Sequence, residues 1–532
     1  MIAAEPDHVA AVTYDEDDDS VVVVIGSGAG GGTMAHELCA RGIAVVLLEA
    51  GPRIEMDAFL NDEWAAYEQL TWTDKRTISG TSPAAILFPE TPSWVVKAVG
   101  GSTTHWGGVC LRIQAHEFKA LSTYGAIKGA NLLDWPVSAE EMAPYYDRAE
   151  AKMGVSGTQG IPPLPANNNY KIFAAGARRV GYRHVDHGNL AINPVPRDGR
   201  NGCDAIGFCF QGCKSGAKWS TLYTEIPKAE ATGNCELRTE CMALRIVHDE
   251  RDHVSGVEYA DRDGHRHLQK ARVVCVAGNA IETTRLLLNS ETSRFSDGLA
   301  NSSGELGRNY MRHMSGFLWA RFARPVHMNR GTVVCGLVRD EAKHEPSRGF
   351  AGGIYMMTEA LGLPYFAAFS KPTGWGSSIT QDIEHYAHTT GCWFCGEDMP
   401  QASNSITLDP SEKDRFGLPI PHVHVDDHPN ELAMKNYGFK KVAALYEAIG
   451  ATKTMEQQPM PSSHNVGTAR MSANPRDGVT NRWGQSHDIP NLFVSDGSLF
   501  TTASAANPTL TIVTLAVRQA EYIAEQMRTH TI

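Results

Sequence analysis

Residues 21–49 read VVVVIGSGAGGGTMAHELCARGIAVVLLE, and the order of elements in this stretch decides the fold. An apolar run leads into a turn that contains Gly26, Gly28 and Gly31, and a helical stretch, a second apolar run and a carboxylate follow. This order is typical of a βαβ unit that binds a dinucleotide. Gly26 permits the tight turn, Gly28 lets the backbone approach a pyrophosphate, and Gly31 lets the helix lie close to the sheet.

The helix that follows the turn predicts an anion site at its N-terminus. Unpaired N–H groups and a partial positive charge there suit the phosphates of a dinucleotide. Glu49 closes the second apolar run, 23 residues after Gly26, where it can accept hydrogen bonds from ribose hydroxyls. A carboxylate at this place disfavours the 2'-phosphate of NADP. The motif by itself leaves FAD and NAD as alternatives.

Length and composition indicate a multidomain globular chain. The sequence has 532 residues, a formal net charge of −12 and 42% hydrophobic residues. Since one hydrophobic core rarely grows beyond about 250–300 residues, we expect two or more cores. The negative charge argues against a general affinity for nucleic acid. No stretch approaches the roughly 20 apolar residues of a membrane span, and residues 1–20 lack the pattern of an export signal, so we expect neither in this chain.

Local patterns place several elements along the chain. Residues 136–153 have helical spacing with Ser138 as an N-cap and Glu141 three residues on. Residues 236–275 contain short β-rich runs between Asp/Gly turns, which predict antiparallel hairpins returning to a buried strand. Residues 316–457 mix aromatic β-like runs with turns and predict a second domain. The CWFC segment at 392–395 has no second cysteine pair nearby and is interpreted as core.

Four segments, in order, resemble the glucose-methanol-choline (GMC) oxidoreductase family of FAD enzymes. They are the 21–49 unit, VGGSTTHWGG at 99–108, CVAGNAIETTRLLLNS at 275–290, and the pair SSHNVGTARM at 462–471 with NPTLTIVTLAVR at 507–518. The resemblance covers nearly the whole chain. It implies FAD as the cofactor and an α/β fold in which a Rossmann-like FAD-binding domain accompanies an α+β substrate domain built on an antiparallel sheet.

The resemblance also implies a division of the chain into domains. Residues 18–135, 201–315 and 458–532 would form three parts of the FAD-binding domain, the second part carrying an iron–sulfur loop and the third the catalytic residues. Residues 136–200 would form a connector and cap region, and residues 316–457 the substrate-binding domain.

Further FAD contacts follow from the matched blocks. The resemblance assigns to FAD binding Gly101, Ser102, His105, Gly278, Asp496 and Thr509. Asp496 also has an ordinary structural interpretation, because it stands in an Asp-Gly turn at the end of a strand. Thr104-His105-Trp106 resembles the Thr-His-Trp of pyranose oxidases, in which the histidine bonds covalently to the flavin; packing against the flavin without a bond is the alternative.

His464 and Asn507, 43 residues apart, correspond to the catalytic pair of the family. Oxidation of an alcohol needs a base that removes the hydroxyl proton while hydride leaves carbon, and a neutral imidazole titrates in the right range. The resemblance therefore implies that His464 is the base and that Asn507 holds the substrate oxygen by a hydrogen bond. The alternative for His464 is a structural histidine in a loop.

Cys203, Cys209 and Cys213 lie within eleven residues and resemble the ligand set of bacterial dehydrogenases of the family, including glucose, fructose and glucoside 3-dehydrogenase large subunits. In those enzymes three thiolates hold a [3Fe-4S] cluster, which can pass the two electrons of a flavin singly to an acceptor. The match departs from the pattern in Cys203-Asp204 and in Cys213-Lys214, where relatives often have a second cysteine and a proline. Zinc or ordinary loop cysteines are the alternatives.

The leading functional hypothesis is an FAD-dependent dehydrogenase that oxidises a hydroxyl of a sugar, glycoside or polyol and passes electrons through the cluster to a cytochrome or another acceptor. A pyranose oxidase-like enzyme that produces hydrogen peroxide and a non-redox FAD-containing lyase are the alternatives. The resemblance implies a small companion subunit with an export signal and a cytochrome c acceptor. We therefore expect a periplasmic location reached through that partner, with a cytoplasmic enzyme as the alternative.

Overall fold

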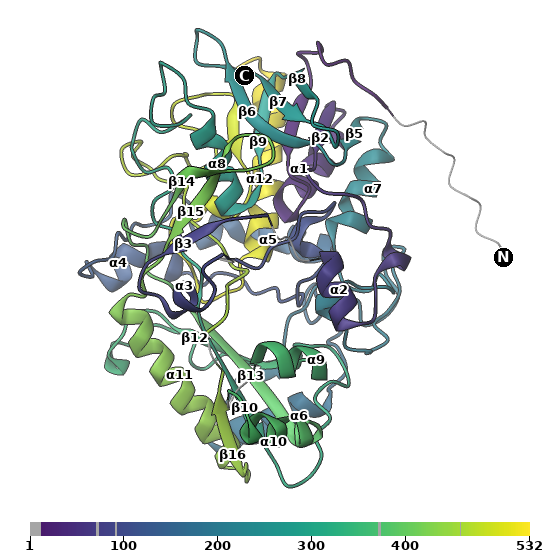
Figure 1. Ribbon diagram of the computed structural model, residues 1–532, viewed down its shortest axis with the longest axis vertical. Coiled ribbons are helices and arrows are strands. Elements are labelled where there is room, and N and C mark those ends of the chain that lie inside the picture. Colours follow the sequence, from purple (N-terminus) through teal and green to yellow (C-terminus); the bar gives the residue numbers. More distant parts are fainter. Residues whose placement is uncertain (1–11, 71–73, 91–92, 371–373, 458) are drawn as a thin grey trace, which may run out of the picture.

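The structure is a computed structural model and describes residues 12–70, 74–90, 93–370, 374–457 and 459–532. Figure 1 shows an upper part that contains the parallel strands β2, β5 and β9 and the last helix, α12, and a lower part that contains the antiparallel strands β10, β12 and β13 with the long helix α11 beside them. Among the described residues, no helix is both long and apolar enough to cross a membrane.

The parallel sheet has the order β17–β9–β1–β2–β5, and all its pairings are parallel. Its strands are β1 (Val22–Ile25), β2 (Val45–Leu48), β5 (Cys235–Arg238), β9 (Val273–Val276) and β17 (Leu492–Val494). Every residue of β1, β2, β9 and β17 is buried, as expected for parallel strands covered on both faces. Helix α1 (Ala29–Cys39) connects β1 to β2, so residues 21–49 form the predicted βαβ unit.

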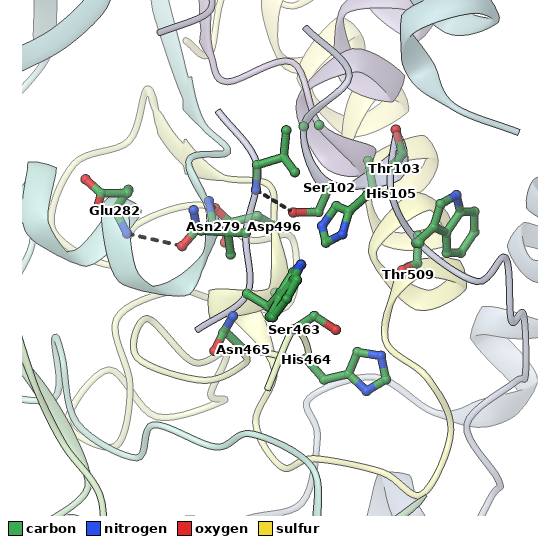
Figure 2. Close-up of a pocket in the computed structure, with 18 of the residues that line it drawn as sticks. Ser102, Thr103, His105, Asn279, Glu282, Ser463, His464, Asn465, Asp496 and Thr509 are labelled. Carbon is green, nitrogen blue, oxygen red and sulfur yellow. Dashed lines mark hydrogen bonds between the residues drawn. The ribbon is translucent and has the colours of Figure 1, made fainter. Parts of the chain in front are cut away.

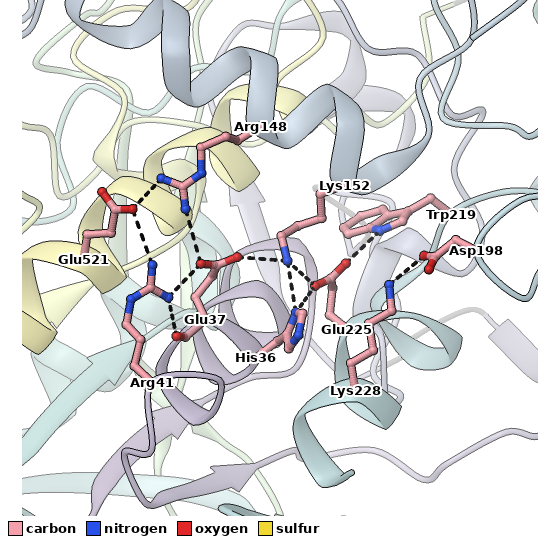
Figure 3. Close-up of polar contacts among 10 residues, drawn as sticks. All are labelled: His36, Glu37, Arg41, Arg148, Lys152, Asp198, Trp219, Glu225, Lys228 and Glu521. Atoms are coloured by element: carbon pink, nitrogen blue, oxygen red, sulfur yellow. Dashed lines mark hydrogen bonds and ion pairs between the residues drawn. The ribbon is translucent and has the colours of Figure 1, made fainter. Parts of the chain in front are cut away.

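Helices from distant parts of the chain cover this sheet. They are α5 (Ala139–Met153), α7 (Glu225–Glu230), α8 (Asn279–Asn289) and α12 (Thr509–Arg528), and α12 packs on both α1 and α5. Ser138 Oγ accepts a hydrogen bond from Glu141 N at 3.2 Å, which confirms the predicted cap of α5. Figure 3 shows the buried polar network between α1, α5 and α7, centred on Lys152 and Glu225.

Residues 236–275 confirm most of the hairpin prediction. β6 (Met242–His248), β7 (Val254–Ala260) and β8 (Arg266–Lys270) form a three-stranded antiparallel sheet that leads to the buried strand β9. The exception is β5, which pairs in parallel with β2 at the edge of the large sheet. A short run of mixed polarity does not show in the sequence which neighbour it will pair with, because pairing is decided by tertiary contacts.

The second part is built on a six-stranded antiparallel sheet of order β16–β10–β13–β12–β11–β4. Its strands are β4 (Val185–His187), β10 (Met314–Arg321), β11 (Gly336–Val338), β12 (Ile354–Glu359), β13 (Thr389–Gly396) and β16 (Lys453–Glu456). Helices α6 (Asn168–Arg179) and α11 (Pro429–Glu447) cover one face. The other face turns toward the first part, and β4 and α6 come from the segment predicted as a connector.

A small sheet of β14 (Ser405–Lys413), β15 (Pro419–His424) and β3 (Thr77–Ser79) adjoins α8. The remaining α-helices are α2 (Glu63–Leu70), α3 (Pro83–Leu87), α4 (Ala120–Tyr124), α9 (Leu363–Tyr365) and α10 (Ser377–Glu384). The prediction of an α/β fold with a second part on an antiparallel sheet is confirmed.

Candidate active site

A cavity of about 410 Å³ lies between the carboxyl ends of the parallel strands and the six-stranded sheet. Ligands of open α/β sheets bind at this end of the strands. The cavity is lined by all the predicted cofactor-binding residues except Gly31, and by the predicted catalytic residues His464 and Asn507. Segments separated by more than 400 residues thus meet at one cavity. The three cysteines of the predicted cluster do not line it.

The glycine turn brings backbone to the cavity. Gly26 has φ +94°, a conformation that favours glycine, and a Cβ there would lie 2.5 Å from Ala277 O. A Cβ at Gly31 would lie 1.8 Å from Gly26 O, so α1 can lie this close to the turn only with glycine at that position. At Gly28 a Cβ would meet only Gly101 Cα, at 3.9 Å, so this side of the turn is open.

Glu49 is buried and organises the turn from the end of β2. One carboxylate oxygen accepts hydrogen bonds from Ser27 N and Ser27 Oγ, and the other accepts from Gly51 N at 2.8 Å. Burial raises the pKa of Glu49, and these hydrogen bonds oppose the rise. Ser27 Oγ in turn accepts a hydrogen bond from Gly100 N at 3.0 Å. Ser27, which sequence reasoning missed, therefore connects the glycine turn to the loop that contains Gly100.

Residues 99–108, which we call the flavin loop, carry His105 into the cavity. His105 is buried, and burial together with the charge of Lys218 lowers its pKa to about 3. Lys218 is itself buried and donates through Nζ to Thr104 O, Trp106 O and Cys209 O. One ammonium group thus joins the flavin loop to the cysteine segment.

Asp496 links the end of β17 to the start of α8. Its carboxylate accepts from Asn279 N at 2.9 Å, from Thr283 Oγ1 at 2.5 Å and from Ser498 N at 2.8 Å. Burial raises the pKa of Asp496. Figure 2 shows Asn279 and Asp496 side by side at the cavity, with Ser102 and His105 of the flavin loop near them. These bonds give Asp496 a structural role, and its contact with a cofactor stays a prediction.

The catalytic prediction rests on His464, whose ring lines the cavity below the flavin loop in Figure 2. His464 Nδ1 lies 2.8 Å from His313 Nδ1, and His313 Nε2 is hydrogen-bonded to Ser504 O. Asn507 is buried three residues after Ser504, at the loop that starts α12. Sequence reasoning missed His313, which stands just before β10 in no recognisable motif. Only the folded chain brings it to His464.

This pair of histidines determines which nitrogen of His464 can act as a base. Because a carbonyl only accepts, His313 Nε2 carries the proton of the neutral ring and His313 Nδ1 is an acceptor. His464 Nδ1 must then donate, which leaves the Nε2 lone pair without a proton. Burial holds the pKa of His464 well below its usual range, and a positive charge on His313 would lower it further. Burial also lowers the pKa of His313, to about 4. Both rings are therefore neutral at pH 7.

Cys203, Cys209 and Cys213 pack against one apolar cluster on the cavity-facing side of the six-stranded sheet. Lys218 N donates to Cys213 Sγ at 3.3 Å, the kind of N–H···S bond that tunes iron–sulfur centres. Burial raises the pKa of Cys203 to about 12, so this thiol ionises at neutral pH only beside a cation. Among described residues, three ligand atoms within 4.8 Å of one another occur at His116, Glu117 and Glu397 rather than here, which disfavours a single zinc ion.

His105 Nε2 and Asn507 Oδ1 are among the buried polar atoms at the cavity that lack a hydrogen-bond partner within the described part of the chain. Leaving such an atom unpaired costs about 1–3 kcal/mol, so buried atoms of this kind face a ligand more often than apolar protein. Together with the open side of Gly28, they fit a bound dinucleotide cofactor. Gly26, Gly28 and the N-terminus of α1 would hold its pyrophosphate.

A Rossmann-like glycine turn at a cavity that also holds a neutral histidine is typical of oxidoreductases that bind a dinucleotide. Two GMC oxidoreductase family models match the chain, one over residues 30–315 and the other over residues 400–516. The chain belongs to the GMC oxidoreductase family, and it is an FAD-dependent enzyme that acts on CH–OH groups.

Relatives extend over almost the whole chain. A 2-methyl-1,2-propanediol dehydrogenase of Mycolicibacterium austroafricanum is 35% identical, over 93% of this chain and 94% of its own. A fructose dehydrogenase large subunit of Gluconobacter japonicus is 27% identical over 94% and 96%, and a paromamine 6'-oxidase of Streptomyces fradiae is 29% identical over 96% and 92%. The fold is shared with pyridoxine 4-oxidase from Mesorbium loti, with TM-score 0.64 and 17% identity over 95% of this chain and 99% of that one.

Proposed function

We propose that the protein is a dehydrogenase that oxidises a hydroxyl of a sugar, glycoside or polyol, and that its electrons leave through a [3Fe-4S] cluster held by Cys203, Cys209 and Cys213. The observation that carries the oxidation step is the His313–His464 pair, which leaves Nε2 of His464 without a proton. Similarity to a fructose dehydrogenase large subunit and to a diol dehydrogenase supports the substrate class.

The residues of this chain perform the proton chemistry. FAD, when bound, supplies the acceptor for the hydride that leaves the carbinol carbon. His464 Nε2 takes the hydroxyl proton, and its Nδ1–H stays bonded to His313, so the ring keeps its orientation as it becomes charged. The Asn507 side chain holds the substrate oxygen, with its amide N–H as donor. The products are a carbonyl compound and a proton on His464.

The contacts of Lys218 support a path for electrons from the flavin loop to the cysteine segment. Its Nζ is bonded to carbonyl oxygens on both sides of His105 and to Cys209 O, so the loop and the first turn of the cysteine segment are held together. A bound cluster would supply a one-electron carrier. Phe210, which follows Cys209, lines the cavity itself.

A second candidate function is a flavin oxidase that reduces oxygen to peroxide. The Thr104-His105-Trp106 loop and the similarity to a paromamine 6'-oxidase favour it, whereas the cysteine trio favours the dehydrogenase. A lyase without net redox chemistry would have no use for the trio. A covalent bond between His105 and the flavin belongs to the oxidase candidate, and denaturation of the holoenzyme tests it by whether the flavin stays with the chain.

The proposal is tested by reducing the purified holoenzyme anaerobically with a panel of sugars and polyols, followed by iron analysis and EPR. We expect loss of oxidised-flavin absorbance, about three irons per chain, an EPR signal of an oxidised three-iron centre, and turnover with a one-electron acceptor but little peroxide in air. Absence of iron together with rapid peroxide formation would establish the oxidase.

A matched pair of cysteine variants tests the role of the cluster separately from that of the flavin. Cys213→Ser should lose iron and turnover with one-electron acceptors while substrate still reduces the flavin. Cys39→Ser, a change at a thiol on the last residue of α1 that does not line the cavity, should keep both. Equal behaviour of the two variants would remove the trio from electron transfer.

We also propose a companion subunit and a cytochrome acceptor, because one relative is named as the large subunit of a dehydrogenase. Export to the periplasm with that companion is part of this proposal. Co-expression with a candidate small subunit and localisation of activity in cell fractions test it; activity confined to the cytoplasm contradicts the export.

A further inference from the structure

Glu359 ends strand β12 and lines the same cavity as His464 and Asn507. Side chains alternate between the faces of a strand, so Glu359 shares a face with Tyr355 and Met357, which pack in the cluster on the cavity side of the sheet. Ile354 and Met356 lie in the opposite cluster, under α6 and α11. The strand therefore points the carboxyl group of Glu359 toward the cavity.

The carboxyl group of Glu359 has no partner within the described part of the chain. The residue is 3% exposed, its Oε2 is buried without a hydrogen bond, and it forms no ion pair with a described lysine or arginine. Burial alone holds the pKa of Glu359 well above its usual range, which favours the neutral carboxylic acid over the carboxylate. A neutral carboxylic acid offers one O–H donor and free acceptor sites.

Trp393 supplies a second unpaired polar atom between Glu359 and the base. Its Nε1 has no hydrogen-bond partner among the described residues, and its ring centroid lies 5.5 Å from that of His464. Trp393 on β13 pairs with Met357 on β12, so Glu359 is its diagonal neighbour, with Cα atoms on the order of 7–8 Å apart. Asn507 Oδ1, Trp393 Nε1 and Glu359 Oε2 are thus three unpaired polar atoms at one cavity.

We infer that Glu359 and Trp393 form a subsite for a hydroxyl group remote from the one being oxidised, and that the substrate is a neutral polyol or sugar. The inference rests on the proposed function and narrows it. A hydroxyl both donates and accepts, so it satisfies a neutral carboxylic acid on one side and receives the indole N–H on the other. A monohydric alcohol leaves both protein groups unpaired in an apolar surrounding, and this loss is the basis of discrimination.

The test compares a polyol with a monohydric alcohol of the same chain length, with flavin reduction in the anaerobic holoenzyme as the readout. Glu359→Leu should lower kcat/KM for the polyol about 10- to 100-fold and leave the monohydric alcohol within a few-fold, since only the remote contact is lost. Glu359→Gln, which keeps a donor and an acceptor, should stay within a few-fold for both substrates. Met357→Leu, a change of similar volume on the same face, controls for repacking.

Several outcomes overturn the inference. These are an equal loss for both substrates in Glu359→Leu, no loss for either, or a wild-type preference for a cationic amino sugar that Glu359→Gln abolishes. The last would show an ionised Glu359 that pairs with an amine. If the wild type reduces its flavin equally well with both alcohols, the proposed oxidation stands and the subsite fails; if no hydroxyl compound reduces the flavin, the proposed function fails first.

Discussion

At the scale of the residue, the tautomer of His464 is set by His313, a partner 151 residues away in sequence. We predict that His464→Ala retains FAD but loses substrate-driven flavin reduction, since a base of this kind contributes roughly 10²- to 10⁴-fold. Anaerobic stopped-flow measurements give the reduction rate, and the absorbance of the purified protein gives the FAD content. A rate close to that of the wild type would show that His464 is not the base.

His313 is a positioning residue, and its removal has a pH signature. The base must be neutral to work, so kcat/KM rises with pH through the pKa of His464. Burial and the nearby His313 both lower that pKa, which places the acid limb of the wild-type profile below pH 6.5. In His313→Gln the charge of His313 no longer lowers the pKa of His464. We therefore expect the acid limb of the kcat/KM profile to move to higher pH, together with a lower kcat. An unchanged limb with a lower kcat would indicate packing alone.

At the scale of elements, the glycine turn between β1 and α1 meets two requirements. Gly31 allows α1 to pack against the turn, and Gly28 leaves room for the approach of a phosphate. Gly31→Ala places a Cβ 1.8 Å from Gly26 O, so α1 must move away from the turn. We predict that this variant destabilises the apoprotein by about 1–3 kcal/mol or more, as overpacking does. Thermal denaturation of the apoprotein measures the effect.

Gly28→Ala is the matched comparison. Its Cβ meets only Gly101 Cα at 3.9 Å, so the fold accommodates it, while the added methyl group lies on the open side of the turn. We expect an apoprotein of nearly wild-type Tm and a weakened affinity for FAD, measured by titration of the apoprotein. If the two variants lose stability to the same extent, the distinction between packing and phosphate approach fails.

Element assignment from sequence succeeded where local signals agree. The unbroken apolar run of β1, with sequence VVVI, and the Ser138 cap of α5 are signals of this local kind. It failed at β5, where the run 235–238 is too short and polar to reveal its parallel partner β2. Cys392 and Cys395 are buried on β13, as interpreted from their isolation in sequence.

At the scale of the whole molecule, buried charges hold the helices around the parallel sheet together. Glu225 on α7 accepts from His36 of α1 at 2.5 Å and from Lys152 of α5 at 2.8 Å (Figure 3). Burial raises the pKa of Glu225, but the bond from His36 and the charge of Lys152 outweigh it and lower that pKa from 4.5 to about 2. A depressed carboxyl pKa stabilises the fold above the unfolded value and loses that effect as pH falls toward the folded one.

We therefore predict that the free energy of unfolding falls between pH 4.5 and pH 2, with about 3 kcal/mol of it due to Glu225. Glu225→Gln should be less stable at pH 7 by a similar amount and show a flatter acid dependence. Asp198→Asn, which breaks the half-exposed pair with Lys228, should cost under about 1 kcal/mol. Urea denaturation at several pH values measures both variants, and parallel acid profiles of Glu225→Gln and wild type would contradict the assignment.

The sequence by itself determined the βαβ unit, the family, the cofactor and the candidates His464, Asn507 and the cysteine trio. Each of these lies in a local motif whose spacing has its own physical reason. Tertiary structure alone decided that His313 sets the tautomer of His464, that Lys218 joins the flavin loop to Cys209, and that Glu359 faces the cavity. These residues stand in no motif, because their roles arise from contacts between chain segments that meet only when the chain is folded.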